Sequence, residues 1–386
     1  MRVVFLIHSL SIGGAERQLT VLSKGLRDRG HEVVVIVFYS GGPLEQDLRS
    51  AGVRIRSLNK RSRWDIRALL GRLPHIIREE RPDVLYAFDG TPNLASLIPK
   101  TMFPELKVVW GIRCSGMELD RYEWIVKPLS ALTRWSANMA DVLVANSNAG
   151  LTYYAANGYP RQKMVMIPNG VDVERFRSDR RLGLSVRGEW GVNDREVLIG
   201  IVARLDPMKD HVTFLRAAAR LAAQREHVRF VCVGEGPRGI RESLERLVET
   251  LGIAPRIIWA GARKDMPAVY NALDICVSSS AYGEGVSNAI SEAMACGVPC
   301  VVTDVGDSPW IVGPLRPIVP PRSPELLADS IAQVCDHLNV STDAIRRQIC
   351  EQLSIENLVA RTEHVLTALL HNTPVNVTAA GSVTVP

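Results

Sequence analysis

Residues 278–302 read SSSAYGEGVSNAISEAMACGVPCVV, and this stretch says most about the fold. The pattern predicts a polar loop, a helix, a tight stop and then a buried strand. Gly283 and Gly285 leave space for a ligand to approach the backbone. Ser287 is expected to be the N-cap, so that the free N–H groups of the first helical turn point at the ligand and favour an anion.

Two glutamates bracket the entry to this helix, because Glu284 precedes the first turn and Glu292 falls inside it. Two carboxylates beside an anion site would repel a phosphate group unless they bind sugar hydroxyls instead. The stretch therefore predicts a pocket for a phosphorylated, hydroxyl-rich ligand. The alternative is a capped amphipathic helix with exposed acids, which does not require this spacing, these glycines and the following strand together.

The stretch resembles the donor-binding signature of retaining glycosyltransferases of family 4. That family has the α/β GT-B fold, in which two doubly wound Rossmann-like domains face each other across a cleft. Its signature has two glutamates eight positions apart and an Ala-Met-Ala-x-Gly-x-Pro run, which residues 292–299 match. The resemblance implies that Glu284 holds hydroxyls of the transferred sugar and that Glu292 holds the nucleotide ribose. It also implies donor contacts at Gly285, Val286 and Ser287.

Residues 204–210, RLDPMKD, place two cations on one loop after a predicted strand, where ligands of α/β proteins bind. The segment is similar to the family's Arg-Leu-x-x-x-Lys signature. This similarity implies that Arg204 and Lys209 bind the donor pyrophosphate and stabilise the departing nucleoside diphosphate. The catalytic residues implied are thus Arg204, Lys209 and Glu284, with no cofactor and no metal. Taken alone, the two cations also fit ordinary surface charge after a strand.

Two glycine-containing loops complete the expected donor site. Gly13 and Gly14 stand at a strand–helix turn, where backbone N–H groups can approach a phosphate. The turn lacks the G-x-G-x-x-G pattern, and no acid ends the second strand, which argues against NAD binding. Gly234 and Gly236 resemble the family's Gly-x-Gly-Pro loop, which lies near the nucleotide. A plain tight turn remains the alternative for the Gly13–Gly14 pair.

One position departs from the family pattern. Many relatives carry a histidine beside the reacting sugar, at the end of the strand predicted at 107–111, and here Arg113 stands in that place. Arginine cannot act as a general base, although it can stabilise negative charge. His8, Asp89 and Asn93 follow predicted strands and are candidates for acceptor or sugar contacts. A packed or solvated histidine is the alternative for His8.

Runs of apolar residues predict two sets of strands, and helical segments separate the strands of each set. The first set lies within residues 3–37 and 84–145, and the second lies within residues 197–302. The Arg-rich segment 175–193 has little periodicity and is the expected linker. The predicted domains are, in chain order, an acceptor-binding domain at 1–185, a nucleotide-sugar-binding domain at 186–355, a helix at 356–371 that crosses back to the first domain, and a disordered tail at 372–386.

The composition is that of a soluble globular protein, with 46% hydrophobic and 23% charged residues among 386. No apolar run approaches the length of a membrane span, and no signal peptide is evident at the N-terminus. Seven scattered cysteines indicate reduced core residues of a cytoplasmic protein, and their spacing does not favour a zinc site.

The charge is concentrated in the first half. Residues 1–190 hold 28 Lys and Arg against 19 Asp and Glu, which suggests an acidic partner. In residues 60–78, arginines alternate with apolar side chains at near-helical spacing, which suits a helix lying on an anionic membrane. These apolar side chains are Trp64, Leu69, Leu70, Leu73 and Ile77. A surface helix with a solvated basic face is the alternative, and no nucleic-acid-binding signature is found.

The expected function is transfer of a hexosyl or N-acetylhexosaminyl group from a nucleotide-diphosphate sugar, UDP-sugar first and GDP-sugar second. The expected acceptor is a hydroxyl of a lipid-linked or polysaccharide intermediate in bacterial surface polysaccharide synthesis, at the inner face of the membrane. Two alternatives remain, a GT-B UDP-sugar epimerase and a non-catalytic two-lobed sugar-binding protein. Turnover of a nucleotide sugar would separate the transferase from the binding protein.

Overall fold

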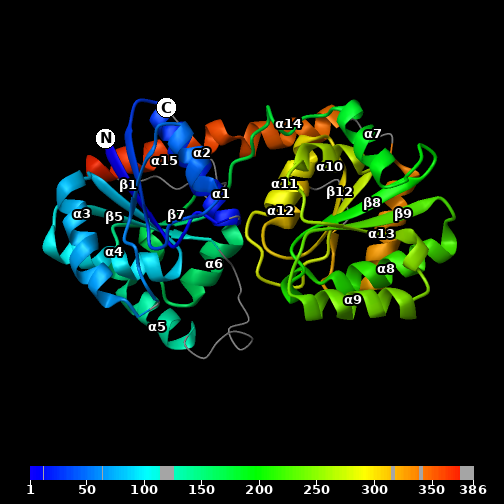
Figure 1. Ribbon diagram of the computed structural model, residues 1–386, viewed down its shortest axis with the longest axis horizontal. Coiled ribbons are helices and arrows are strands. Elements are labelled where there is room, and N and C mark those ends of the chain that lie inside the picture. The colour runs from blue at the N-terminus through cyan, green and yellow to red at the C-terminus, as the bar shows by residue number, and fades with distance from the viewer. Residues whose placement is uncertain (12, 63, 114–125, 314–317, 339–341, 374–386) are drawn as a thin grey trace. The chain divides into compact units, whose positions relative to one another are not determined.

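The computed structural model describes residues 1–11, 13–62, 64–113, 126–313, 318–338 and 342–373 (Figure 1). The chain divides into two compact units. The first unit runs from Met1 to Gly170 and takes in the chain from Ile355 onward, and the second unit runs from Val171 to Ser354. The two units are two α/β domains of similar design.

The first unit is built on a parallel sheet of seven strands in the order β3-β2-β1-β4-β5-β6-β7. The strands are β1 (Arg2–Ile7), β2 (Glu32–Val37), β3 (Arg54–Ser57), β4 (Val84–Phe88), β5 (Lys107–Ile112), β6 (Val142–Ala145) and β7 (Met164–Met166). Most are continuous apolar runs, as expected of strands covered on both faces. The strand order reverses beside β1, which makes the sheet doubly wound.

Helices cover both faces of this sheet. The helices are α1 (Gly14–Asp28), α2 (Leu44–Ser50), η1 (Ala68–Arg72), α3 (Leu73–Glu80), α4 (Gly90–Met102), α5 (Val126–Ser136), α6 (Asn148–Ala156) and α15 (Ile355–Leu370). Helices α1, α2 and α15 lie on one side of the sheet, and α3, α4 and α5 lie on the other (Figure 1).

The second unit has a parallel sheet of six strands in the order β10-β9-β8-β11-β12-β13. The strands are β8 (Val197–Val202), β9 (Val228–Val233), β10 (Ile257–Gly261), β11 (Ile275–Ser278), β12 (Cys300–Thr303) and β13 (Ile318–Val319). The order reverses between β8 and β11, which is where open α/β sheets bind ligands.

Two hydrophobic clusters fill the two faces of the second sheet. One lies under α8 (His211–Gln224), α9 (Arg238–Thr250) and α13 (Pro324–Asp336). The other lies under α7 (Arg180–Glu189), α10 (Met266–Ala272), α11 (Asn288–Ala295), α12 (Ser308–Val312) and α14 (Thr342–Leu353). Figure 1 shows these two groups of helices on opposite sides of the strands.

The boundary between the units differs from the predicted one at 185/186. The structure assigns residues 171–185 to the second unit, because the segment predicted as a linker forms helix α7 and packs on α10. A Cβ atom on Gly183 would lie 2.1 Å from the carbonyl oxygen of Asn271, and the N–H of Asp179 donates to the Asn271 side chain at 2.7 Å. The helix was not predicted because the sequence of α7 is mostly polar. Asp179 caps its first turn.

The last helix also begins one residue earlier than predicted, at Ile355, and belongs to the first unit. It packs against α1, where Val359 lies so close to Gly25 that a Cβ atom there would come within 2.3 Å. Glu363 adds an ion pair with Arg29 at 2.7 Å. Of the predicted disordered tail at 372–386, Asn372 and Thr373 are described and donate backbone hydrogen bonds to the end of α15, and residues from 374 onward lie outside the described residues.

The described part of the segment 60–78 is helical only from Ile66 onward, and the π-helical turn η1 runs directly into α3. It contains η1 and the first part of α3, and the side chains of Leu73 and Ile77 are buried in the first unit because α3 packs on the sheet. By contrast, Trp64, Ile66 and Leu70 are 66%, 58% and 59% exposed. The predicted apolar stripe is therefore divided between core and surface. Within the described parts of the chain, no helix is long and apolar enough to cross a bilayer.

Candidate functional site

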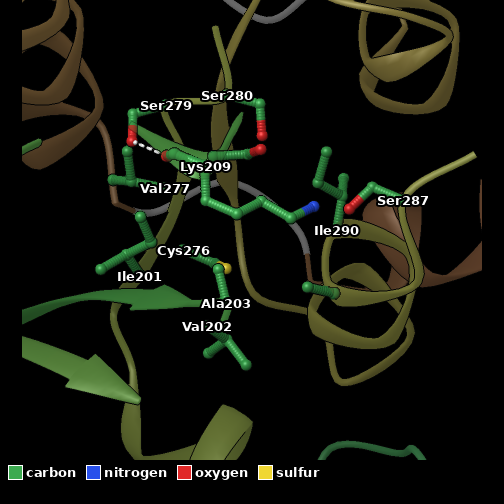
Figure 2. A pocket seen from close by; sticks show the side chains of 12 residues that line it. Ile201, Val202, Ala203, Lys209, Cys276, Val277, Ser279, Ser280, Ser287 and Ile290 are labelled. Carbon is green, nitrogen blue, oxygen red and sulfur yellow. Dashed lines mark hydrogen bonds between the residues drawn. The ribbon is translucent and has the colours of Figure 1, made fainter. Parts of the chain in front are cut away.

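A pocket lies in the second unit at the carboxyl ends of β8 and β11 (Figure 2). Its lining combines the ends of these two strands, Lys209, the serines 278–280 and the start of α11. The pocket therefore occupies the point at which the strand order reverses, as the topology of the sheet predicts.

Lys209 is held in this pocket by the turn between β8 and α8. The carboxylate of Asp206 accepts from the N–H of Met208 at 2.9 Å and begins the short helix 207–209. Asp210 has a φ of 46° and caps α8 by accepting from the N–H of Thr213 at 3.1 Å. The hydroxyl of Ser279 donates to the carbonyl of Lys209 at 2.9 Å. The turn is thus fixed at both ends and tied to the end of β11.

The amine of Lys209 forms an ion pair with Oε1 of Glu284. The hydroxyl of Ser280 donates to the same oxygen at 2.6 Å. Because Glu284 is only 6% exposed, its charge needs these partners. Figure 2 shows the side chain of Lys209 reaching across the pocket towards Ile290 and Ser287. The structure thus brings together two residues that the sequence assigned to one site.

Glu292 lies in the second turn of α11, eight residues after Glu284. Its Oε2 atom accepts a hydrogen bond of 2.8 Å from the hydroxyl of Tyr270, which is 1% exposed. Tyr270 was not among the predicted site residues. Its only sequence signal is that it stands on a short helix just before the strand that leads into the pocket.

The start of α11 differs in detail from the prediction. Ser287 does occupy the N-cap position, but its hydroxyl accepts no capping hydrogen bond and instead lines the pocket. Val286 is 4% exposed and its side chain belongs to the hydrophobic core, so only its backbone can meet a ligand. The carbonyl of Gly285 accepts from the N–H of Asp307 at 3.3 Å, which anchors the loop before the helix.

Arg204 stands apart from Lys209. Its side chain is 74% exposed and lies 3.5 Å from Asp206, and it is not among the residues that line the described pocket. An exposed arginine on the loop of Lys209 has room to turn towards a bound anion. The predicted role in binding phosphate therefore stays a prediction for this residue.

Gly234 and Gly236 bring the loop after β9 against the loop after β8. A Cβ atom on Gly234 would lie 2.0 Å from the carbonyl oxygen of Ala203, and one on Gly236 would lie 2.3 Å from that of Leu205. The N–H of Leu205 donates to the carbonyl of Glu235 at 3.0 Å across the same contact. The packing of the two loops therefore requires glycine at both positions, independently of any contact that they make with a nucleotide.

In the first unit, the glycine pair begins α1. Gly13 is the N-cap with a φ of −149°, which any residue can adopt, and Gly14 is the first helical residue. His8 lies at the end of β1, and its ring centroid is 4.9 Å from that of Tyr39. Partial burial, followed by the charge of Lys60, lowers the pKa of His8 below its usual value.

Asp89, Asn93 and Arg113 come together at the carboxyl ends of β4 and β5. Oδ1 of Asp89 accepts from the N–H of Arg113 at 3.0 Å, and the amide of Asn93 donates to the carbonyl of Gly111 at 3.1 Å. Burial raises the pKa of Asp89 to about 6, although the charge of Arg113 opposes this shift. Asp89 also has a φ of 61°, a strained value for a residue with a side chain.

The guanidinium of Arg113 is fixed in place. It lies 4.4 Å from the ring centroid of Phe88 and donates to Oδ1 of Asn169 at 3.1 Å. Arg113 is therefore a positioned cation at the end of β5 in the first unit. Its Nε atom has no hydrogen-bond partner among the described residues.

No three histidine, cysteine, aspartate or glutamate side chains gather as a metal-binding group within the ranges that the structure describes. Burial raises the pKa of Cys296, which lies beside Glu292, to about 12. The thiol of Cys296 is therefore protonated at neutral pH.

Two family models match this chain. Residues 12–175 match the model described as "Glycosyltransferase Family 4", and residues 196–337 match the one described as "Glycosyl transferases group 1". The N-acetyl-alpha-D-glucosaminyl L-malate synthase of Bacillus anthracis is 24% identical over 92% of this chain and 93% of its own length. The D-inositol 3-phosphate glycosyltransferase of Segniliparus rotundus is 34% identical, over 45% of this chain.

The chain spans about half or less of the length of most of the curated relatives that it matches, including 39% of the Segniliparus protein. Among solved structures, Anabaena HepE in complex with UDP has a TM-score of 0.83 at 21% identity, covering 95% of this chain and 100% of that one. Sucrose-phosphate synthase from Thermosynechococcus elongatus has a TM-score of 0.79 at 16% identity, covering 97% and 100%.

These structural likenesses show the same fold, with two Rossmann-like units, and the two family models together account for most of the chain. The chain therefore belongs to glycosyltransferase family 4 and has the GT-B fold.

Proposed function

We propose that this glycosyltransferase moves a sugar from a nucleotide-diphosphate sugar to a hydroxyl group of an acceptor, with retention of the anomeric configuration. The observation that carries the proposal is the Lys209–Glu284 pair at the point where the strand order reverses. A lysine suits phosphate and a carboxylate suits sugar hydroxyls, so one pocket offers groups for both parts of such a donor.

The proposed mechanism follows from the roles given to the two glutamates. A double displacement needs a carboxylate as nucleophile, whereas Glu284 and Glu292 are both assigned to binding. The acceptor therefore attacks from the face that the diphosphate leaves, and a phosphate oxygen takes the proton of the acceptor hydroxyl. Lys209 stabilises the charge that develops on the departing diphosphate, and Arg204 turns in from its exposed position to add a second cation. No metal or other cofactor is assigned a role.

UDP-sugar is the first choice of donor and GDP-sugar the second. HepE, which shares the fold, has been solved with UDP and with UDP-glucose. A relative in Mycolicibacterium smegmatis is a GDP-mannose-dependent mannosyltransferase. Three curated relatives, the Bacillus anthracis synthase and the glycosyltransferases of Segniliparus rotundus and Mycolicibacterium smegmatis, do not favour the epimerase alternative, because none of them carries the name of an epimerase.

The acceptor is proposed to be lipid-linked or a polysaccharide intermediate of a bacterial surface. Arg113 gives the first unit a fixed cation beside Asp89 and Asn93, a suitable place for an acceptor that carries both hydroxyl and acidic groups. One structural neighbour is a lipopolysaccharide outer core galactosyltransferase, which supports a role in surface polysaccharide synthesis.

The first test is release of nucleoside diphosphate from UDP-, GDP- and ADP-sugars, with and without a bacterial membrane extract and with EDTA present. We expect release from one donor, an increase with the extract, and no effect of EDTA. The Glu284→Gln variant is the control and should release far less, because it loses the charge that pairs with Lys209. Absence of release from all three donors would argue against the transferase.

We also propose that the surface formed by residues 61–62 and 64–70 contacts an anionic membrane at the cytoplasmic face, where a lipid-linked acceptor would be reached. Trp64, Ile66 and Leu70 are more than half exposed, and Arg61 and Arg67 are exposed among them. Apolar side chains that enter the interface beside cations are the features of such a surface.

Replacing Trp64 by serine should weaken binding to vesicles rich in phosphatidylglycerol by about tenfold, because burial of a large apolar side chain is lost. Co-sedimentation with vesicles measures this change. Trp135→Ser is the matched control, since Trp135 is 77% exposed on α5 of the same unit. Equal binding by the Trp64 variant and the wild type, or a loss confined to the Trp135 variant, would contradict the assignment.

A further inference from the structure

The carboxylate of Glu292 is held by a buried phenol from another helix. Tyr270 stands on α10, and its hydroxyl donates to Oε2 of Glu292 at 2.8 Å across 22 positions of sequence. The ring of Tyr270 is 1% exposed and packs edge-on against Phe176, with 5.9 Å between ring centroids. The phenol therefore occupies a fixed point in the core of the second unit, and the glutamate that it contacts lies in the helix that begins at the pocket.

We propose that Tyr270 is a positioning residue that sets the orientation of the Glu292 carboxylate for the ribose of the donor nucleotide. This inference rests on the proposed function, in which Glu292 binds ribose hydroxyls. Tyr270 does not itself touch the nucleotide in this assignment, and it acts only through Glu292.

The physical reason lies in the last torsion of a glutamate side chain, which has a broad energy minimum and leaves the carboxylate plane free to rotate. A hydrogen-bond donor fixed at one carboxylate oxygen removes this freedom before the ligand arrives. The ligand then loses less affinity to the ordering of Glu292, which is the general effect of preorganisation. Hydrogen bonds to an ionised group are also stronger than those between neutral groups.

The protonation state of Tyr270 suits this role. Burial, with the nearby charge of Glu292 as a further cause, raises the pKa of Tyr270 well above its usual value. The phenol is therefore a hydrogen-bond donor throughout the physiological pH range. A change of pH between about 6 and 9 should leave its contact with the carboxylate unchanged, since the ordinary pKa of tyrosine already lies above this range.

The experiment compares binding of UDP and GDP with binding of their 2′-deoxy and 3′-deoxy analogues by calorimetry. In the wild type, we expect one of the two diphosphates to bind at least about tenfold more tightly than one of its deoxy analogues, as the loss of a hydrogen bond to a charged group would give. Glu292→Gln should abolish most of this preference. These two results test the proposed function of Glu292 without reference to Tyr270.

Tyr270→Phe then tests the inference. We expect it to weaken binding of the preferred diphosphate by about five- to tenfold and to reduce the preference over the deoxy analogue, with little further change when Glu292→Gln is added. Val269→Ala is the packing control, because Val269 is 0% exposed on the same helix and the change keeps both the phenol of Tyr270 and its contact with Phe176. It should lower stability and leave the preference for the hydroxyl unchanged.

The outcomes are distinct. A wild type with no preference for the ribose hydroxyls would reject the proposed role of Glu292, and the inference would fail with it. A preference that Glu292→Gln removes but Tyr270→Phe keeps would overturn the inference alone. Equal weakening of both nucleotides by Tyr270→Phe, with the preference intact, would show that the phenol has only a structural role.

Discussion

Replacing Lys209 by alanine should lower kcat by about 10²- to 10³-fold, the usual effect of removing one preorganised group that stabilises charge in a transition state. The amine lies in the pocket at the end of β8, where the proposed reaction releases a diphosphate. Water that replaces the amine must reorganise as the charge develops, whereas Lys209 is already fixed by the turn that Asp206 and Asp210 close.

The same change should lower the free energy of unfolding by roughly 3 kcal/mol, because it leaves a buried carboxylate without its cation. Glu284 is 6% exposed, and a hydroxyl such as that of Ser280 does not replace a charge. Loss of activity in Lys209→Ala thus has two causes, instability and the missing amine, and the double variant Lys209→Met with Glu284→Gln tests the first of them. This variant removes both charges, so we expect stability to return towards that of the wild type and kcat to stay low.

Urea unfolding and kinetics at saturating donor measure the two effects. Lys209→Arg is a further control, since it keeps a positive charge and should retain the fold with an intermediate rate. A folded Lys209→Ala variant whose kcat is within about threefold of the wild type would be incompatible with the assigned role, because such a variant would show that the amine contributes almost nothing to the transition state.

Much of the site could be predicted from the sequence because its parts are local motifs. Residues 204–210 and 278–302 each follow a strand, and the carboxyl ends of parallel strands meet at one edge of a sheet. That Lys209 contacts Glu284 across 75 positions depends on β8 and β11 being neighbours, which only the sheet order shows.

Other features depend on tertiary contacts that leave no local pattern. Tyr270 reads as one more apolar residue of a short helix, and nothing in its neighbourhood predicts a hydrogen bond to Glu292. The segment 175–193 looks like a linker because α7 is mostly polar, although Gly183 packs directly on α10. The apolar residues of 60–78 have helical spacing, but the π-helical turn η1 changes that spacing and the packing of α3 buries only some of them.

The second large effect is expected at Gly234. Its φ is +138°, a value that is strained for any residue with a Cβ atom, and a Cβ atom there would lie 2.0 Å from the carbonyl oxygen of Ala203. Backbone strain and overpacking each contribute about 1–3 kcal/mol, so Gly234→Ala should lower the free energy of unfolding by about 2–6 kcal/mol. A backbone oxygen cannot move aside as a flexible side chain would, so the two loops must separate.

Separation of the loops should also lower activity, because Ala203 directly precedes Arg204 and the N–H of Ala203 donates to the carbonyl of Val233 at 2.9 Å. The matched control is Gly239→Ala, five residues later in α9, where a Cβ atom would meet nothing within 4 Å. There alanine should leave activity unchanged and raise stability by up to about 1 kcal/mol. Urea unfolding and donor turnover of the two variants measure the contrast. If Gly234→Ala were as stable and as active as Gly239→Ala, the loop contact would not be the reason for a glycine at 234, and a direct approach of the nucleotide to the backbone would then explain it better.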